Sequence, residues 1–251
     1  MSNYVEPFVG YWHDGKLEVS GLKVGQKIRN KKEGPPYMVV HEQIQSVYVS
    51  AESWPGRLWR VRVTELGDMS NTMTNIYYMR AVEIELIEEL PIAMLFGEQG
   101  DKIVPLLNQI TVLESLTVDK FYESHIEKSI TEAAYGRAWE HWNENLKYPR
   151  AHTYNSGNTI ASPSRYDQKK SPINGGFYLI SDLIRKRARE LDGDEAFVED
   201  VYYGEVELVL NPRWGAACDA FLYQAMALSM KSELSHADFS VLTQAWRIVF
   251  E

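Results

Sequence analysis

The sequence predicts an α+β protein, with an antiparallel β-rich N-terminal domain followed by a mostly helical C-terminal half. Before Pro91, aromatic and β-branched residues alternate with charged ones, which is typical of strands with one buried face. After Pro91, Ala, Leu and Trp recur every three or four residues, which is typical of amphipathic helices. We therefore expect a β-rich domain over residues 1–90 and a helical domain over residues 91–251.

Three segments of the first domain carry a strand pattern. Residues 8–12 predict a short strand that turns at His13-Asp14-Gly15, because Asp-Gly between alternating segments favours a tight turn. Residues 58–64 predict the clearest strand, and residues 76–88 predict a second long one. Between them, residues 42–51 have the apolar spacing of a short helix.

The two long strands carry opposite charges on their polar faces. If they pair, Arg60 and Arg62 lie opposite Glu83 and Glu85. One interpretation is an ordinary cross-strand charge ladder, and the other is a polar cleft lined by paired charges.

Polar residues with capping side chains mark the expected helix starts in the second domain. Pro212 supports one of them, because proline is favoured at the first position of a helix. Residues 202–210 predict a single strand within this helical half. The expected caps are Thr117, Thr131, Ser181, Asn211 and Ser235.

Residues 149–176 differ from the rest of the helical half. They are rich in Pro, Ser, Asn, Gly and Thr and show no apolar periodicity, so we expect a long polar insertion. It is either a solvated linker or a lid or partner-binding loop. In the second case its candidate binding residues are Tyr154, Asn155 and Tyr166.

Net charge and aromatic content limit the classes of partner. The chain carries a net charge of −9, and residues 96–251 hold 16 Lys and Arg against 23 Asp and Glu. An acidic surface repels the phosphate backbone, so we expect no general nucleic-acid binding and favour a protein partner, which a basic surface would suit. Aromatic residues make up 12% of the chain and serve either the core or a binding face.

Cysteine usage and hydropathy indicate a cytoplasmic location, the host cytoplasm if the protein is viral. Cys218 is the one cysteine, so no disulfide forms within the chain. The first residues lack the basic and apolar stretches of a signal peptide. No apolar run approaches the ~18 residues that a membrane span requires, so we expect no membrane association.

No motif for a specific chemistry is found. The sequence lacks a phosphate-binding loop, a dinucleotide fingerprint, a nucleophile elbow and a metal-ligand spacing, so we expect no cofactor and no metal. The catalytic candidates are His41 beside Glu42, as a general base, and Tyr78 with Arg80, as a grip for a phosphate or carboxylate group.

Residues 34–91 resemble an uncharacterised group of phage and prophage proteins with a small β-rich N-terminal domain and an Ala- and Trp-rich helical tail. The matching segments are residues 42–48, 58–63 and 78–84. Members of the group carry a histidine after a glycine, whereas Gly34 is followed here by Pro35, so no role of that histidine transfers. The resemblance implies an origin in a virus or mobile element.

Three functional hypotheses follow from these observations. The favoured one is a phage or mobile-element accessory protein that binds a host or viral macromolecule without catalysis, for example to inhibit a host system. The alternatives are a minor virion component and a nucleotide-processing enzyme such as an ADP-ribosyltransferase-like protein. The absence of a catalytic motif leaves enzymatic activity open but disfavoured.

Overall fold

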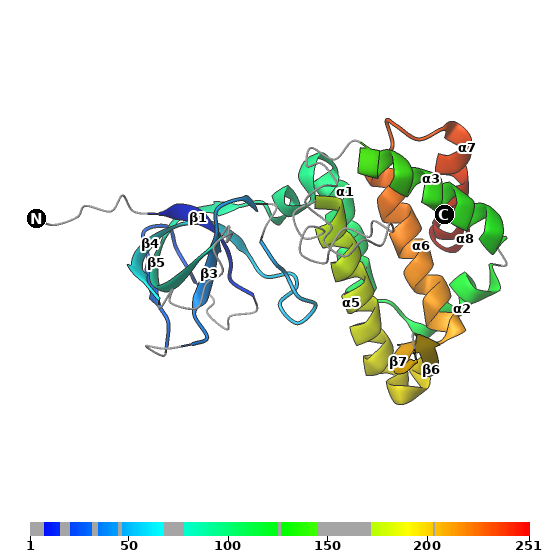
Figure 1. Ribbon diagram of the computed structural model, residues 1–251, viewed down its shortest axis with the longest axis horizontal. Helices are drawn as coiled ribbons and strands as arrows, with labels where there is room; N and C mark the ends of the chain where they lie inside the picture. The colour runs from blue at the N-terminus through cyan, green and yellow to red at the C-terminus, as the bar shows by residue number, and fades with distance from the viewer. Residues whose placement is uncertain are drawn as a thin grey trace, which may run out of the picture. The chain divides into compact units, whose positions relative to one another are not determined.

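The computed structural model describes residues 8–15, 21–31, 35–44, 47–67, 78–124, 127–144, 172–202 and 204–251. An antiparallel sheet occupies the N-terminal half and helices dominate the C-terminal half, so the predicted α+β class is confirmed (Figure 1). Two compact units divide the chain. The first covers residues 1–100 and 169–175, and the second covers residues 101–168 and 176–251.

The first unit is a small antiparallel barrel. β4 pairs with β5 and with β1, β1 pairs with β3, and β3 pairs back with β5, so these four strands form a closed ring. β2 extends the edge of β5 beyond β3. The elements are β1 (Val9–His13), β2 (Lys27–Arg29), β3 (Met38–His41), β4 (Leu58–Leu66), β5 (Tyr78–Leu90) and the 3₁₀ segment η2 (Ile92–Gln99).

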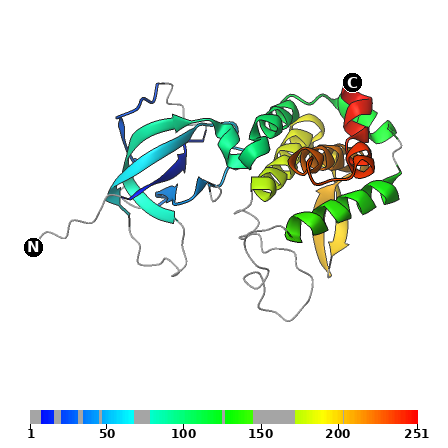
Figure 2. The same cartoon turned by 90° about the horizontal axis from the view of Figure 1, so that it is seen from above.

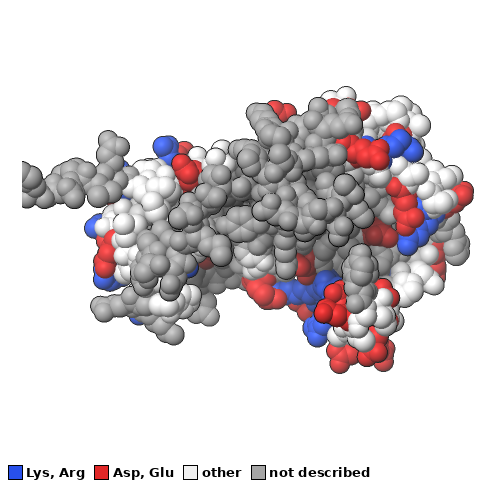
Figure 3. Space-filling model, in the orientation of Figure 1, with Lys and Arg blue, Asp and Glu red and all other residues white. Residues whose placement is uncertain are grey.

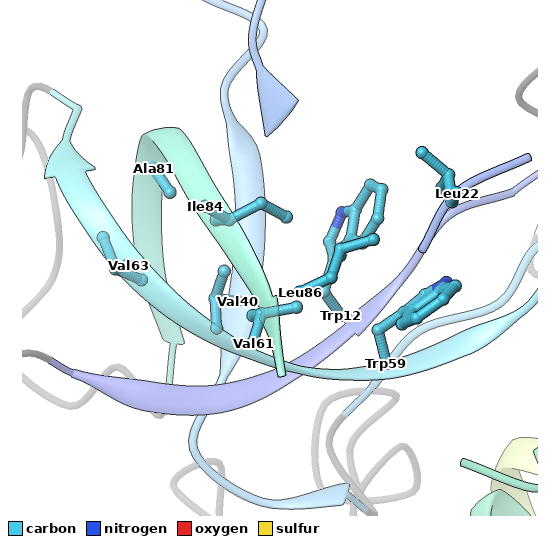
Figure 4. Close-up of a cluster of buried hydrophobic side chains, with 9 residues drawn as sticks. All are labelled: Trp12, Leu22, Val40, Trp59, Val61, Val63, Ala81, Ile84 and Leu86. Atoms are coloured by element: carbon cyan, nitrogen blue, oxygen red, sulfur yellow. The ribbon is translucent and has the colours of Figure 1, made fainter. Parts of the chain in front are cut away.

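The barrel interior is filled by the apolar residues that alternate along the strands. On β4, Trp59, Val61 and Val63 are buried while Arg60 is exposed, as the period of two predicts. Figure 4 shows these side chains converging from several strands on one cluster. Its members are Trp12, Leu22, Val40, Trp59, Val61, Val63, Ala81, Ile84 and Leu86.

The polar faces of β4 and β5 form an exposed charge ladder. Arg62 lies opposite Glu85, and their side chains approach to 2.7 Å. Arg60 lies opposite Glu88, not opposite Glu83, because antiparallel partners run in opposite directions from the Arg62–Glu85 pair, and a register shift between Arg60 and Val61 adds one more residue. Such exposed ion pairs contribute little stability, and the ladder interpretation holds for this face.

Of the short helix expected over residues 42–51, the described residues show only a 3₁₀ position at Ile44, whose carbonyl accepts from the Val47 amide at 3.1 Å. Ser50 and Ser53 form a turn instead. The Ser53 amide donates to the Ser50 carbonyl, and the Ser53 hydroxyl accepts from the Ser50 amide, both at 3.0 Å. Serine side chains compete in this way with helical hydrogen bonds.

A buried carboxylate connects the end of β1 to the start of β4. Asp14 is 5% exposed and accepts hydrogen bonds from the Arg57 amide (2.6 Å), the Arg57 Nε (2.7 Å) and the Trp59 indole (3.3 Å). Beside it, the His13 ring accepts from the Gly15 amide and approaches the Pro55 carbonyl at 3.1 Å. The predicted turn at residues 13–15 therefore also anchors the residues before β4.

The second unit is a helical assembly with one β-hairpin. Figure 2 shows α6 running between the other helices, with the hairpin behind it. The elements are α1 (Gly100–Thr111), α2 (Ser115–Glu123), α3 (Lys128–Glu144), α5 (Pro172–Asp192), the 3₁₀ turn η4 (Gly193–Ala196), β6 (Phe197–Tyr202), β7 (Glu205–Leu210), α6 (Pro212–Ser229), α7 (His236–Leu242) and α8 (Gln244–Phe250). None of the helices in the described ranges is both long enough and apolar enough to cross a bilayer.

Two of the five expected caps are confirmed. The Asn211 side chain accepts from the Trp214 amide, and the Ser235 hydroxyl accepts from the Asp238 amide, both at 3.0 Å. The caps expected at Thr117, Thr131 and Ser181 are wrong, because α2, α3 and α5 begin earlier.

Two of the three misplaced starts have a local reason. Thr131 is buried inside α3, where its hydroxyl donates to the Glu127 carbonyl. α5 begins at Pro172, and the glycines that follow it hide the helical pattern in the sequence. Of the polar insertion expected over residues 149–176, residues 172–176 belong to this helix, and residues 149–171 lie outside the described ranges.

The strand expected over residues 202–210 is one half of a hairpin. β6 and β7 pair antiparallel from Phe197 opposite Leu210 to Tyr202 opposite Glu205. The sequence did not reveal β6 because Glu199 and Asp200 are poor strand formers. Tertiary pairing overrides that local preference.

We predict that Gly10→Ala destabilises the barrel by about 2 kcal/mol or more, because overpacking against rigid backbone is unfavourable. A Cβ at Gly10 would lie 2.4 Å from the His41 carbonyl oxygen, where β1 and β3 meet. Urea unfolding monitored by tryptophan fluorescence measures the effect. The matched control is Gly136→Ala, where a Cβ meets nothing within 4 Å and no loss of stability is expected. Equal midpoints for Gly10→Ala and the wild type would contradict the prediction.

Candidate functional site

Three of the four catalytic candidates lie together on the outside of the barrel. His41 on β3 pairs with Tyr78 on β5, and their ring centroids are 6.0 Å apart. Arg80 is two residues further along β5 and therefore on the same face as Tyr78, while Met79 between them packs against the barrel core. Glu42 follows β3 and is exposed. The other candidates, Tyr154, Asn155 and Tyr166, lie outside the described residues.

A cavity of about 660 Å³ lies within the second unit, and none of the predicted site residues lines it. Its walls come from α2, the start of α3, the β6–β7 hairpin, α6 and the α7–α8 segment. This volume is in the range of pockets that hold small molecules. The residues on which its chemistry depends are Phe121, Lys128, Glu199, Gly215, Asp219 and Tyr223.

One face of α6 forms the longest wall of the cavity. The lining positions are 212, 215, 216, 219, 220 and 223, which is a single stripe at helical spacing. Gly215, Ala216 and Ala220 are small, and a Cβ added at Gly215 would meet nothing within 4 Å. The opposite face, which includes Trp214, Ala217 and Phe221, is buried in the core. The small residues on the first stripe thus leave the space open.

Asp219 lies in the middle of this stripe, and Lys128 is the cation that acts on its carboxylate electrostatically. No hydrogen bond or ion pair joins its carboxylate to another residue in the described ranges. Burial raises the pKa of the Asp219 carboxyl above its ordinary value, and the nearby charge of Glu132 adds to this, whereas the Lys128 ammonium opposes it. A half-buried, unpaired carboxylate is unfavourable for folding, so its position calls for a reason other than stability.

Aromatic rings line the space around Asp219. Tyr223 is one helical turn further along α6, and its ring meets Tyr135 at a centroid distance of 4.9 Å. Burial raises the pKa of the Tyr223 phenol, with the charges of Asp219 and Glu132 acting in the same direction, so the hydroxyl stays protonated. Phe121 and Tyr122 line the cavity from α2. Aromatic faces beside a carboxylate favour cations.

The charged lining of the cavity is mainly acidic. Glu199 and Asp200 on β6 are exposed and, with Asp219, outnumber Lys128. Lys128 forms an i,i+4 ion pair with Glu132 at 3.5 Å. Figure 3 shows acidic side chains gathered at the end of the second unit where Figure 1 places the hairpin. The electrostatic potential there attracts positively charged groups.

The geometry disfavours two kinds of chemistry at this site. Cys218 is buried on α6, and burial raises the pKa of its thiol to about 12, so it is not a thiolate nucleophile at ordinary pH. No group of three His, Cys, Asp or Glu side chains able to hold a metal ion occurs within the described ranges. The acidic and aromatic side chains of the lining are groups that attract cations.

Sequence reasoning did not find this site. It identified the buried stripe of α6 through Ala217 and Phe221, which the structure confirms. The one available signal was Asp219 itself, a single acid within the alanine-rich segment 216–227. The rest of the cavity comes from segments about 100 residues apart in the chain.

No protein-family model, curated protein or solved structure matches this chain. Its function is therefore inferred from its own residues.

We predict that Asp219→Asn raises stability at pH 7, on the order of 1 kcal/mol, because it removes an unpaired, partly buried charge. The raised pKa means that ionised Asp219 opposes folding at neutral pH, and that this opposition fades as the pH falls through the folded-state pKa. Thermal unfolding of both proteins between pH 7.5 and pH 4.5 measures the difference. It should be largest at the top of this range and shrink toward the bottom. A variant less stable than the wild type at pH 7 would show that Asp219 has a structural partner.

Proposed function

We propose that this protein acts by binding, without catalysis, and that its second unit accepts a basic segment of a protein partner in the cavity beside α6. The observation that carries the proposal is the unpaired Asp219 carboxylate in an open, mainly acidic cavity. A cationic side chain entering the cavity supplies the missing partner.

The cavity matches a side chain of a protein better than a whole small molecule with many polar groups. Apart from its charged residues and Tyr223, much of its lining is apolar, including Val209, Leu210, Ala216 and Ala220. A long cationic side chain has an apolar stem and a charged end, so it complements such a lining. Glu199 and Asp200 then meet further positive charges on the same partner segment.

The barrel surface carries the competing enzymatic hypothesis. His41, Tyr78 and Arg80 share one face, but they lie on a strand wall and line no part of the cavity described above. A general base and an anion grip act on a substrate held between them, which requires a concave surface. The second unit offers the more specific binding geometry.

The biological setting of this proposal is an accessory protein of a phage or mobile element, with a host or viral protein as the partner. That setting rests on the resemblance of residues 34–91 to phage and prophage proteins.

We predict that blocking the cavity abolishes binding of a basic peptide. The probe is a fluorescein-labelled octapeptide of alternating Lys and Arg, titrated with the protein and followed by fluorescence polarisation. Gly215→Phe places a ring in the open space and should weaken binding at least about tenfold, because the peptide side chain loses its site. Gly136→Phe is the matched control, since it adds the same ring to an exposed helical glycine with nothing within 4 Å.

Two double variants distinguish the effect on peptide binding of acids in the cavity from the effect of the protein's net charge. Glu199→Gln with Asp200→Asn removes two acids from the cavity, and Asp194→Asn with Glu195→Gln removes two exposed acids from η4, outside the cavity lining. The first pair should weaken binding more, with a smaller loss of affinity on added salt than the wild type shows. Equal losses in the two double variants, or no effect of Gly215→Phe, would overturn the proposal.

A further inference from the structure

The cavity restricts which cationic side chain of a partner can enter it, both through the group that binds the charged end and through the lining that contacts the aliphatic part of that side chain. Asp219 is a single carboxylate, and the other cavity acids, Glu199 and Asp200, project from the hairpin strand β6. Asp200 already accepts a hydrogen bond from the Val201 amide at 2.9 Å. The lining of α6 therefore presents one free carboxylate, together with the Tyr223 hydroxyl one turn away.

The surroundings of Arg213 in the same unit show how many hydrogen-bond acceptors a partly buried guanidinium group needs. Arg213 donates to Asp119 at 2.5 Å, to Asp192, and to the Ser115 carbonyl at 2.9 Å. Two carboxylates and a carbonyl surround its planar fork of donors. The α6 stripe of the cavity offers Asp219 and Tyr223 as its only polar side chains, so an arginine bound along this stripe would leave N–H groups unsatisfied.

A primary ammonium group fits this wall. It is compact, and its three donors rotate freely, so one carboxylate and one hydroxyl satisfy most of its hydrogen-bonding capacity. The four methylene groups of a lysine stem then pack along Ala216, Ala220 and Leu210. The Tyr223 ring adds attraction for the charge.

We propose that the cavity selects an unmodified lysine side chain, whose ammonium group pairs with Asp219. This inference rests on the proposed function, because it names the residue of the basic segment that enters the cavity. It has a regulatory consequence. Acetylation of that lysine removes its positive charge and most of its donors, so a modified partner segment does not bind.

The test uses three labelled hexapeptides: hexalysine, hexaarginine and hexalysine acetylated on every side chain. We expect wild-type protein to bind hexalysine about tenfold more tightly than hexaarginine, and not to bind the acetylated peptide, because a charge-assisted hydrogen bond corresponds to at least this factor. Asp219→Asn should reduce hexalysine affinity to the hexaarginine level. Asp194→Asn, which removes an exposed acid on η4, should leave the ratio unchanged.

The outcomes separate this inference from the proposed function. Equal affinity for the two cationic peptides, or tighter binding of hexaarginine, overturns lysine selection. So does an Asp219→Asn variant that keeps the wild-type preference. If Gly215→Phe still abolishes binding in those cases, the proposed function stands. If neither cationic peptide binds, or if Gly215→Phe has no effect on their binding, both proposals fail. A loss of hexalysine affinity in the Asp219→Asn variant cannot be attributed to unfolding, because this variant is expected to be more stable than the wild type.

Discussion

The architecture of the second unit depends on the guanidinium group of Arg213. It connects α6 to α2 through Asp119 and the Ser115 carbonyl, and to α5 through Asp192. The neighbouring Trp214 indole donates to the same Asp192 at 2.7 Å, so two adjacent residues fix the start of α6. These contacts join α6, which lines the cavity, to two of its neighbouring helices. Because the donors of this partly buried side chain are matched to acceptors, the cluster favours one arrangement of three helices over alternatives.

Two aspartates of this chain show how different a carboxylate's role can be. Asp14 in the barrel is almost fully buried and accepts three hydrogen bonds, so it joins two segments and its environment is complete. Asp219 is less deeply buried but has no such partner in the described residues. The first arrangement contributes to stability, whereas the second opposes it. Residues that oppose stability in this way are typical of binding sites, where a ligand supplies the hydrogen bonds or ion pairs that the folded chain does not provide.

The two units also differ in how their side chains are distributed between the core and the surface. In the barrel, apolar residues that alternate along the strands point inward and fill the space, while charged residues lie on the outer face. In the helical unit, α6 has packed neighbours on one side and small residues on the other. The outer face of a strand pair is nearly flat. By contrast, the glycine and alanine residues on one face of α6 leave a concave space beside the helix. The binding geometry therefore arises in the helical unit.

The sequence by itself determined the α+β class, the two long strands and the caps at Asn211 and Ser235, because these follow from local periodicity and from side chains that bond within three residues. It did not determine where α5 begins, the pairing of β6 with β7, or the register that moves Arg60 opposite Glu88. It also named His41 with Glu42 and Tyr78 with Arg80 as separate candidates, and only the pairing of β3 with β5 brings His41 beside Tyr78. The cavity was decided by the tertiary structure alone. Its walls come from α2, α3, α6, α7–α8 and a hairpin. Only their packing leaves Gly215 facing open space and Asp219 without a hydrogen bond or ion pair to any described residue. Local patterns report which face of an element is apolar, but they contain no information about which distant element covers it.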